Sequence, residues 1–196
     1  AKEQSVARDA ELKKASESSV LGYRAVAVVV HPDNPLAGLS VDELRDIYSG
    51  KVARWPEQSH KIQLFGLPRA HRAARLFESE VVGPKTAAKL ARRPTTAKVI
   101  EAVAREPAAI GFVDAAELHP KESLVNVVGL LPPGGTRPLA PNREQVPPDY
   151  PLARAIRVYV APDASEAARD LARFITSDDC RAMLPEHDLI PPSPER

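Results

Sequence analysis

The chain has 196 residues, of which 43% are apolar and 27% are charged, and its net charge is +1 at neutral pH. These values are typical of a folded globular protein and exclude wholesale disorder. The balanced charge argues against a nucleic-acid partner that is bound through its phosphates. No apolar run approaches the roughly 18 residues of a membrane span, and a single cysteine, Cys180, excludes an internal disulfide.

The first part of the chain predicts an opening helix or turn, a buried strand and a short capped helix. Residues 5–19 have little apolar face and read as the opening helix or turn. Residues 23–30 form a continuous β-branched run, which is typical of a strand buried on both faces. Residues 40–49 predict a helix that begins with a capping box, because Ser40 is followed three positions later by Glu43.

Strands and helices then alternate along the rest of the chain. We expect strands at 62–65, 109–113, 124–128 and 155–161, and helices at 69–81, 85–93, 95–105 and 165–176. The last helix is amphipathic, with Leu171 and Ile175 among the residues expected to face inward. A long loop over residues 130–151 holds seven prolines and two adjacent glycines. This alternation predicts an α/β fold with a largely parallel sheet.

The segment GLPRAHRAARLF, residues 66–77, carries the best candidate for a binding site. It joins a strand to a helix, where free backbone N–H groups and the helix dipole attract anions. Arg69, His71 and Arg72 place cationic side chains at this end, and positive charge there is unfavourable without an anion. The alternative is that Arg72 and Arg75 simply lie on a solvated helix face. The ligand-binding candidates are Arg69, His71 and Arg72, together with Thr95 and Thr96 at the start of a following helix.

Nothing in the residue pattern indicates catalysis or a metal site. The five histidines show no ligand-pair spacing, so no metal and no cofactor is expected. Neither a G-x-S-x-G nucleophile turn nor a G-x-x-x-x-G-K-[ST] phosphate loop occurs. An enzyme that uses His71 as general base ranks last, because no partner carboxylate is identifiable by spacing. We therefore predict a protein that is not an enzyme.

Four stretches, in the right order, resemble phosphate-binding proteins of ABC transporters. The first, VAVVVHPDNPLAGLSVDELRDIYSGKVARWPE, resembles their hinge strand, Asn-Pro corner and following helix. The second is PAAIGFV at residues 107–113, and the third is YPLAR at residues 150–154 with the strand after it. The fourth is the closing stretch ARFITSDDCRAMLPEHDLIPP.

The resemblance implies a type II periplasmic-binding-protein fold, with two α/β lobes joined by crossing strands around a ligand cleft. Residues 1–27 and 150–196 would form a partial first lobe, residues 28–130 the second lobe, and residues 131–149 a Pro-rich inter-lobe loop. It also implies phosphate or a related oxyanion as ligand, delivery to an ABC permease, and no catalysis. The expected location is periplasmic or extracellular, with the signal peptide outside this chain.

The chain departs from the family pattern where ligand is held. Ala7 stands where the family has a Ser or Asp, and His71-Arg72-Ala73 stands where it has an anion-cradling Ser-Gly-Thr. The usual N-terminal segment is also lacking, so the first lobe is expected to be incomplete and open to cover by another protein chain. The alternative function is therefore a degenerate binding-protein-like module that acts through protein–protein contacts without ligand.

Overall fold

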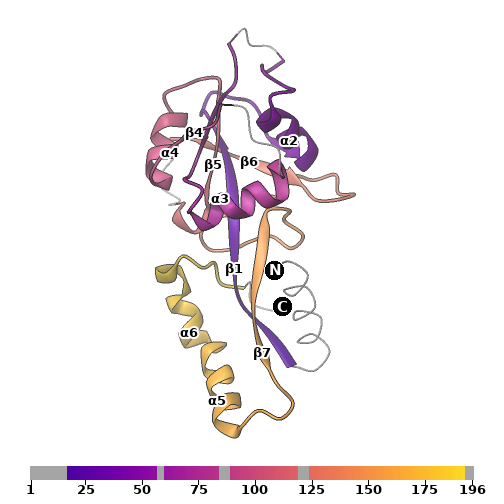
Figure 1. The fold of residues 1–196 in the computed structure, drawn as a ribbon, viewed down its shortest axis with the longest axis vertical. Helices are drawn as coiled ribbons and strands as arrows, with labels where there is room; N and C mark the ends of the chain where they lie inside the picture. Colours follow the sequence, from indigo (N-terminus) through magenta and orange to yellow (C-terminus); the bar gives the residue numbers. More distant parts are fainter. Residues whose placement is uncertain (1–16, 57–59, 84–88, 119–123, 193–196) are drawn as a thin grey trace.

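A computed structural model describes residues 17–56, 60–83, 89–118 and 124–192. The molecule is elongated and has two parts, which one long strand, β1 (Glu17–Val30), connects (Figure 1). The upper part contains most of the sheet with helices α2, α3 and α4, and the lower part contains β7, α5 and α6. Most of the expected opening helix lies outside the described residues, but residues 17–19 belong to β1, so the helix prediction was wrong there.

Strand β1 pairs with three other strands and is antiparallel to each of them. Its first half pairs with β7 (Ala153–Val160), and its second half lies between β5 (Ala109–Asp114) and β6 (Asn126–Leu131). The stretch from Val26 to Val30 is fully buried, as its continuous β-branched run predicted. One strand is therefore the core of the upper sheet and also the start of the lower part.

The sheet is mixed, which corrects the expectation of a largely parallel sheet. Its order is β2-β6-β1-β5-β3-β4, and β7 pairs with β1 off this path. The β2–β6, β3–β4 and β3–β5 pairs are parallel. Helices between β3, β4 and β5 supply the crossovers that parallel pairs need, whereas β1 enters the sheet from the lower part and runs against its neighbours. The bounds of the short strands are Gly38–Ser40 for β2, Gln63–Gly66 for β3 and Ala91–Arg92 for β4.

Strand β4 replaces the end of the helix expected at residues 85–93. Ala91 lies opposite Phe65 of β3, and the Arg93 amide donates a hydrogen bond of 2.8 Å to the Gly66 carbonyl. Pairing with the open edge of β3 thus overrides the local helix propensity. Residues 84–88 lie outside the described residues, so the first part of that prediction has no outcome.

Helix α2 (Val41–Ser49) forms where its capping box predicted. The Ser40 hydroxyl accepts a hydrogen bond of 3.1 Å from the Glu43 amide, and the Ser40 amide donates one of 2.8 Å to the Glu43 carboxylate. Gly50 ends the helix with φ of 81°, a left-handed conformation that glycine adopts without strain. The helix buries Tyr48, whose hydroxyl donates to the Phe65 carbonyl at 3.3 Å.

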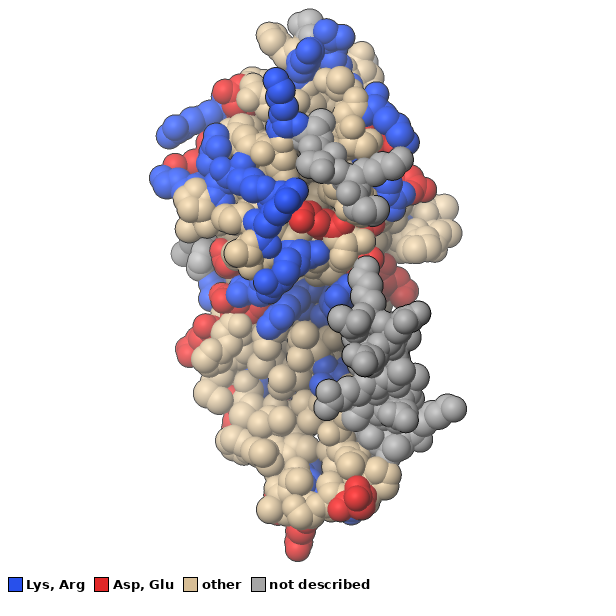
Figure 2. Space-filling view, viewed as in Figure 1, with Lys and Arg blue, Asp and Glu red and all other residues tan. Residues whose placement is uncertain are grey.

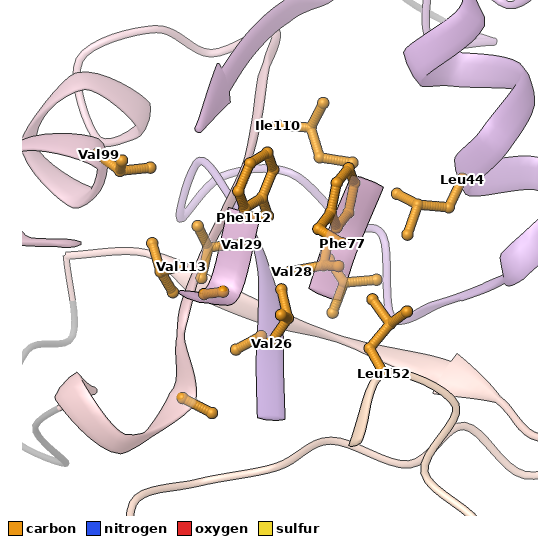
Figure 3. Packing of buried hydrophobic residues seen from close by; sticks show 14 of the residues in the cluster. Val26, Val28, Val29, Leu44, Phe77, Val99, Ile110, Phe112, Val113 and Leu152 are labelled. Atoms are coloured by element: carbon orange, nitrogen blue, oxygen red, sulfur yellow. The ribbon is translucent and has the colours of Figure 1, made fainter. Parts of the chain in front are cut away.

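The remaining helices of the upper part cover the sheet around an aromatic core. Helix α3 (Arg72–Phe77) continues into the π-helical turn η1 (Glu78–Val82), α4 spans Thr96–Val103, and the 3₁₀ turn η2 (Ala115–Glu117) follows β5. The rings of Phe77 and Phe112 are stacked with centroids 4.1 Å apart. Figure 3 shows these two rings side by side among Val28, Ile110 and Leu44. The core therefore fixes α3 against β1 and β5.

The Pro-rich loop and the tail are tied to β1 at the point where the two parts meet. The Tyr150 hydroxyl donates to the Val26 carbonyl at 2.8 Å, and the Val26 amide donates to the Leu152 carbonyl at 2.9 Å. In the tail, Ile190 and Tyr23 exchange backbone hydrogen bonds of 2.7 and 2.9 Å. These bonds hold both chain segments in place beside the junction.

The helices of the lower part are largely exposed, because few described residues pack against them. Helix α5 (Glu166–Ile175), α6 (Asp178–Met183) and the 3₁₀ turn η3 (Leu184–His187) lie beside β7 (Figure 1). Neither α5 nor α6 has a buried residue. The side chains of Leu171, Phe174 and Met183 are 60%, 59% and 48% exposed. Leu171 was expected to face inward, so that prediction was wrong: the described residues bring no layer of chain over this helix face.

Gly66 offers a test of the aromatic core. A Cβ atom at this position would lie 2.3 Å from Cε1 of Phe112, and Phe112 cannot retreat because it is stacked on Phe77. We expect Gly66→Ala to lower the free energy of unfolding by about 1–3 kcal/mol through overpacking, measured by urea denaturation. In a Phe112→Leu background the same substitution should cost less. An equal cost in both backgrounds would show that the ring is not the cause.

Candidate functional site

The loop from β3 to α3 places His71 and Arg72 where the two parts of the molecule meet. His71 is the N-cap of α3, and its Nδ1 accepts a hydrogen bond of 3.2 Å from the Ala73 amide. The helix starts later than residue 69 because the His71 amide turns back to donate to the Pro68 carbonyl at 2.8 Å. The imidazole thus does the capping that a Ser or Asp side chain performs in most helices.

Arg72 reaches carboxylates from two separate segments. Its Nε lies 2.9 Å from Oδ2 of Asp114, at the end of β5, and its Nη2 lies 2.9 Å from Oδ2 of Asp188, just after η3. Glu117 of η2 is more distant, with Oε1 3.6 Å from the Arg72 Nη2 and 3.5 Å from the His71 Nε2. We call these five residues the α3-head cluster: His71, Arg72, Asp114, Glu117 and Asp188.

The contacts of Arg72 are ion pairs rather than well-directed hydrogen bonds. Both Nε and Nη2 are buried and, within the described residues, neither has a hydrogen-bond partner of good geometry. A guanidinium has five N–H donors in a fixed fork that suits carboxylate and phosphate oxygens. Arg72 is therefore held in place by charge, with its Nε beside Asp114 and its Nη2 beside Asp188.

Asp114 is the buried member of the cluster, with a side chain 4% exposed. Burial raises the pKa of its carboxyl above the ordinary value, and the nearby Arg72 guanidinium and the Ala116 amide oppose that shift. The Ala116 amide donates to Oδ1 of Asp114 at 3.1 Å. Asp114 thus stays partly desolvated and depends on Arg72 for its charge balance.

The sequence-predicted site residues have different surroundings. The Thr96 hydroxyl is buried and accepts a hydrogen bond of 3.4 Å from the Asp114 amide, so Thr96 lies behind the cluster. Thr95 caps α4, accepting from the Lys98 amide at 3.3 Å. Arg69 is mostly exposed, and its Nε lies 3.6 Å from Glu78. The structure therefore brings together His71 and Arg72, with Thr96 in support.

Sequence reasoning missed the three acidic residues of the cluster. Asp114 had a readable signal, since it directly follows a buried strand and strand ends gather at one edge of a sheet. Asp188 had none, because its approach to Arg72 depends on the way the tail packs on β1.

His71, Asp114 and Glu117 also bring their ligand atoms within 4.8 Å of one another, as a metal site would. Two features argue against a metal ion. The Nδ1 of His71 accepts the helix-capping hydrogen bond, so in the neutral ring Nε2 carries the proton and has no free lone pair. Arg72 already supplies positive charge to Asp114 and Glu117. The cluster suits the guanidinium better than a divalent cation.

A cavity of about 310 Å³ opens beside the cluster, between α3 and the strands that join the two parts. Four arginines line it: Arg24 of β1, Arg72 and Arg75 of α3, and Arg154 of β7. We call it the junction cavity. Figure 2 shows Lys and Arg side chains gathered in a band across the middle of this face, at the level of α3, whereas the face below is mostly uncharged. Lys and Arg side chains are thus plentiful on this face at the level of α3.

A larger cavity, of about 880 Å³, lies in the lower part between the start of β1, β7 and the Pro-rich loop. Tyr23, Tyr150 and Pro147 contribute to its walls, together with Arg157 and Arg181. It has fewer arginines than the junction cavity and does not include the start of α3. Its size alone does not indicate a ligand, so we place the candidate site at the junction.

The family model of the PBP superfamily domain matches residues 4–179, which is most of the chain. The chain belongs to this family. It is 25% identical over 183 residues to the phosphate-binding protein PstS of Bacillus subtilis (strain 168), an alignment that covers 89% of this chain and 59% of PstS. The chain thus spans less than two thirds of the length of this curated relative.

Similarity to solved structures shows that the chain has the type II periplasmic-binding-protein fold. PstS from Borrelia burgdorferi has a TM-score of 0.74 at 13% identity, over 94% of this chain and 75% of that one. The ABC-type phosphate transport receptor from Vibrio cholerae has a TM-score of 0.68 at 18% identity, over 90% and 72%. The chain therefore spans about three quarters of the length of these structures.

One structure of similar fold matches the chain almost end to end. It is a periplasmic protein that has been provisionally described as metal-binding. Its TM-score is 0.56 at 14% identity, and the alignment covers 97% of this chain and 98% of that one. That structure is therefore similar in length to this chain.

The balance between Arg72 and Asp114 predicts a measurable pKa change. In Arg72→Met the burial of Asp114 remains while the guanidinium is removed, so we expect the pKa of Asp114 to rise further, followed by NMR of the carboxyl carbon. Because the folded-state pKa lies above the unfolded one, the stability contributed by this group is fully present below the unfolded pKa of about 3.9 and is lost as pH rises through the folded pKa.

Arg69→Met is the matched control, since Arg69 contacts Glu78 instead of Asp114. The pKa of Asp114 should stay at the wild-type value in this variant. If Arg72→Met also leaves it unchanged, the ion pair at 2.9 Å does not govern the charge of Asp114.

Proposed function

We propose that the chain is a solute-binding domain that holds phosphate or a related oxyanion at the junction of its two lobes. The observation that carries the proposal is the concentration of guanidinium groups there: Arg24, Arg72, Arg75 and Arg154 line one cavity. Membership of the PBP superfamily and the similarity to the phosphate-binding protein PstS support a solute of this class.

The binding residues that we propose at the start of α3 are His71 and Arg72. Arg72 would donate to the anion from the part of its guanidinium that lines the junction cavity, while Asp114 and Asp188 keep its side chain oriented. The Nε2–H of His71, now facing Glu117, adds a further donor. Arg69 would contribute mainly to the positive field. Thr95 would cap α4, and Thr96 would act through its hydrogen bond with the Asp114 backbone.

The proposed partner is an ABC permease, and the proposed location is periplasmic or extracellular, as for binding components of transporters. Within the described residues no helix is long and apolar enough to cross a membrane. We assign the chain no catalytic role, since its relatives are named for phosphate binding and His71 uses one ring nitrogen as a helix cap.

A second candidate is a module that has lost its ligand and works through protein contacts. Two observations favour it: Arg72 already lies near three carboxylates, and Leu171, Phe174 and Met183 are exposed on the lower part. On this hypothesis the α3-head cluster would fix the angle between the lobes, and another chain would cover α5.

Isothermal titration calorimetry with phosphate, sulfate and small carboxylates separates the two candidates. We expect one saturable site for phosphate or sulfate, and at least tenfold weaker binding in Arg72→Met, because a charge-assisted contact of about 1.5–3 kcal/mol is removed. Binding should also weaken as salt is raised.

Arg173→Met is the control, since Arg173 lies on α5, is exposed and pairs with Asp170. Its affinity for the anion should equal that of the wild type. If none of these anions releases heat with the wild-type protein, the solute-binding function is wrong and the ligand-free module is favoured.

A further inference from the structure

The rim of the junction cavity carries an excess of positive charge. Arg24 of β1 lies directly opposite Arg154 of β7 in the antiparallel ladder, so the two side chains project from the same face. Like charges in directly opposed positions destabilise a strand pair. Arg75 adds a third guanidinium from α3, where its Nη1 donates only to the Ala70 carbonyl, at 3.1 Å.

Few acidic groups offset these three arginines. Arg154 pairs with Glu80 at 2.8 Å, but both side chains are largely exposed. Within the described residues Arg24 makes no ion pair with a carboxylate. The one acidic residue in the cavity lining, Asp114, is engaged with Arg72. An anion between Arg24, Arg75 and Arg154 would relieve the repulsion that Glu80 offsets only in part.

The inner wall of the same cavity is apolar. Ala25, Ala73 and Leu76 are buried, and Ile156 of β7 is half-buried beside them. The cavity volume of about 310 Å³ is roughly ten times the ~30 Å³ that a water molecule takes up in the liquid. Inorganic phosphate has five heavy atoms and no apolar surface, so it would leave this wall in contact with water.

We propose that the ligand of the junction cavity is a phosphate monoester with a small organic group, rather than inorganic phosphate. The phosphate would lie among Arg24, Arg75 and Arg154, and the organic group would cover Leu76 and Ile156. This inference rests on the proposed function, because it assumes that the junction holds an anion. It goes further in naming the class of anion and the residues that select it.

The test is a calorimetric titration of the whole chain with inorganic phosphate, glycerol phosphate, phenyl phosphate and pyrophosphate. We expect at least one monoester to bind about tenfold more tightly than phosphate, a difference of about 1.4 kcal/mol. Glycerol and phenol, which lack the phosphate, should not bind measurably. In Arg24→Gln the affinity for the monoester should fall at least fivefold, while Arg173→Gln on α5 keeps the wild-type value.

A variant of the apolar wall tests the organic subsite separately. In Ile156→Ser the ratio of monoester affinity to phosphate affinity should fall towards one, because the wall that favours the ester has been made polar. Val158→Ser is the matched control, since Val158 lies two residues further along β7, is also half-buried and does not line the cavity. Its affinity ratio should be that of the wild type.

The outcomes separate this inference from the proposed function. If phosphate binds as tightly as every monoester, the inference is wrong and the oxyanion-binding function stands. If pyrophosphate binds more tightly than the monoesters, the cavity selects charge alone and the organic subsite is wrong. If no anion binds, both proposals are overturned.

Discussion

Strand β1 is a single continuous element that belongs to both parts of the molecule and connects them. Its buried stretch supplies the middle of the upper sheet, and its first half is the partner of β7. Tyr150 and Ile190 attach the Pro-rich loop and the tail to the same strand. Because one strand carries these attachments, the site that we propose lies where its pairing changes from β7 to β5 and β6.

The sequence predicted elements whose cause is local. The Ser40–Glu43 box and Gly50 determine α2 within ten residues, and the β-branched run before His31 predicted a strand buried on both faces. Strand β4 and the direction of β1 escaped prediction, because both depend on which strand edges meet after folding. The exposure of Leu171 escaped it too, since helical periodicity identifies an apolar face but does not say what covers it.

Only the part of the candidate site at the start of α3 could be predicted from the sequence. His71 and Arg72 stand at a strand-to-helix junction, where an anion site is expected on physical grounds. Arg24 and Arg154 are separated by most of the chain, and only the β1–β7 register makes them neighbours. Asp188 reaches Arg72 from the tail. Contacts of this kind depend on tertiary packing, for which single-sequence periodicity carries no signal.

The bridge between Arg72 and Asp188 joins a helix of the upper part to a tail that β1 anchors beside the junction. Asp188 sits in the left-handed region with φ of 56°, so its carboxylate is presented from a tight, specific turn. Dissolved ions weaken such a partly exposed pair by screening. We therefore expect the contact between the start of α3 and the tail to weaken as the ionic strength rises.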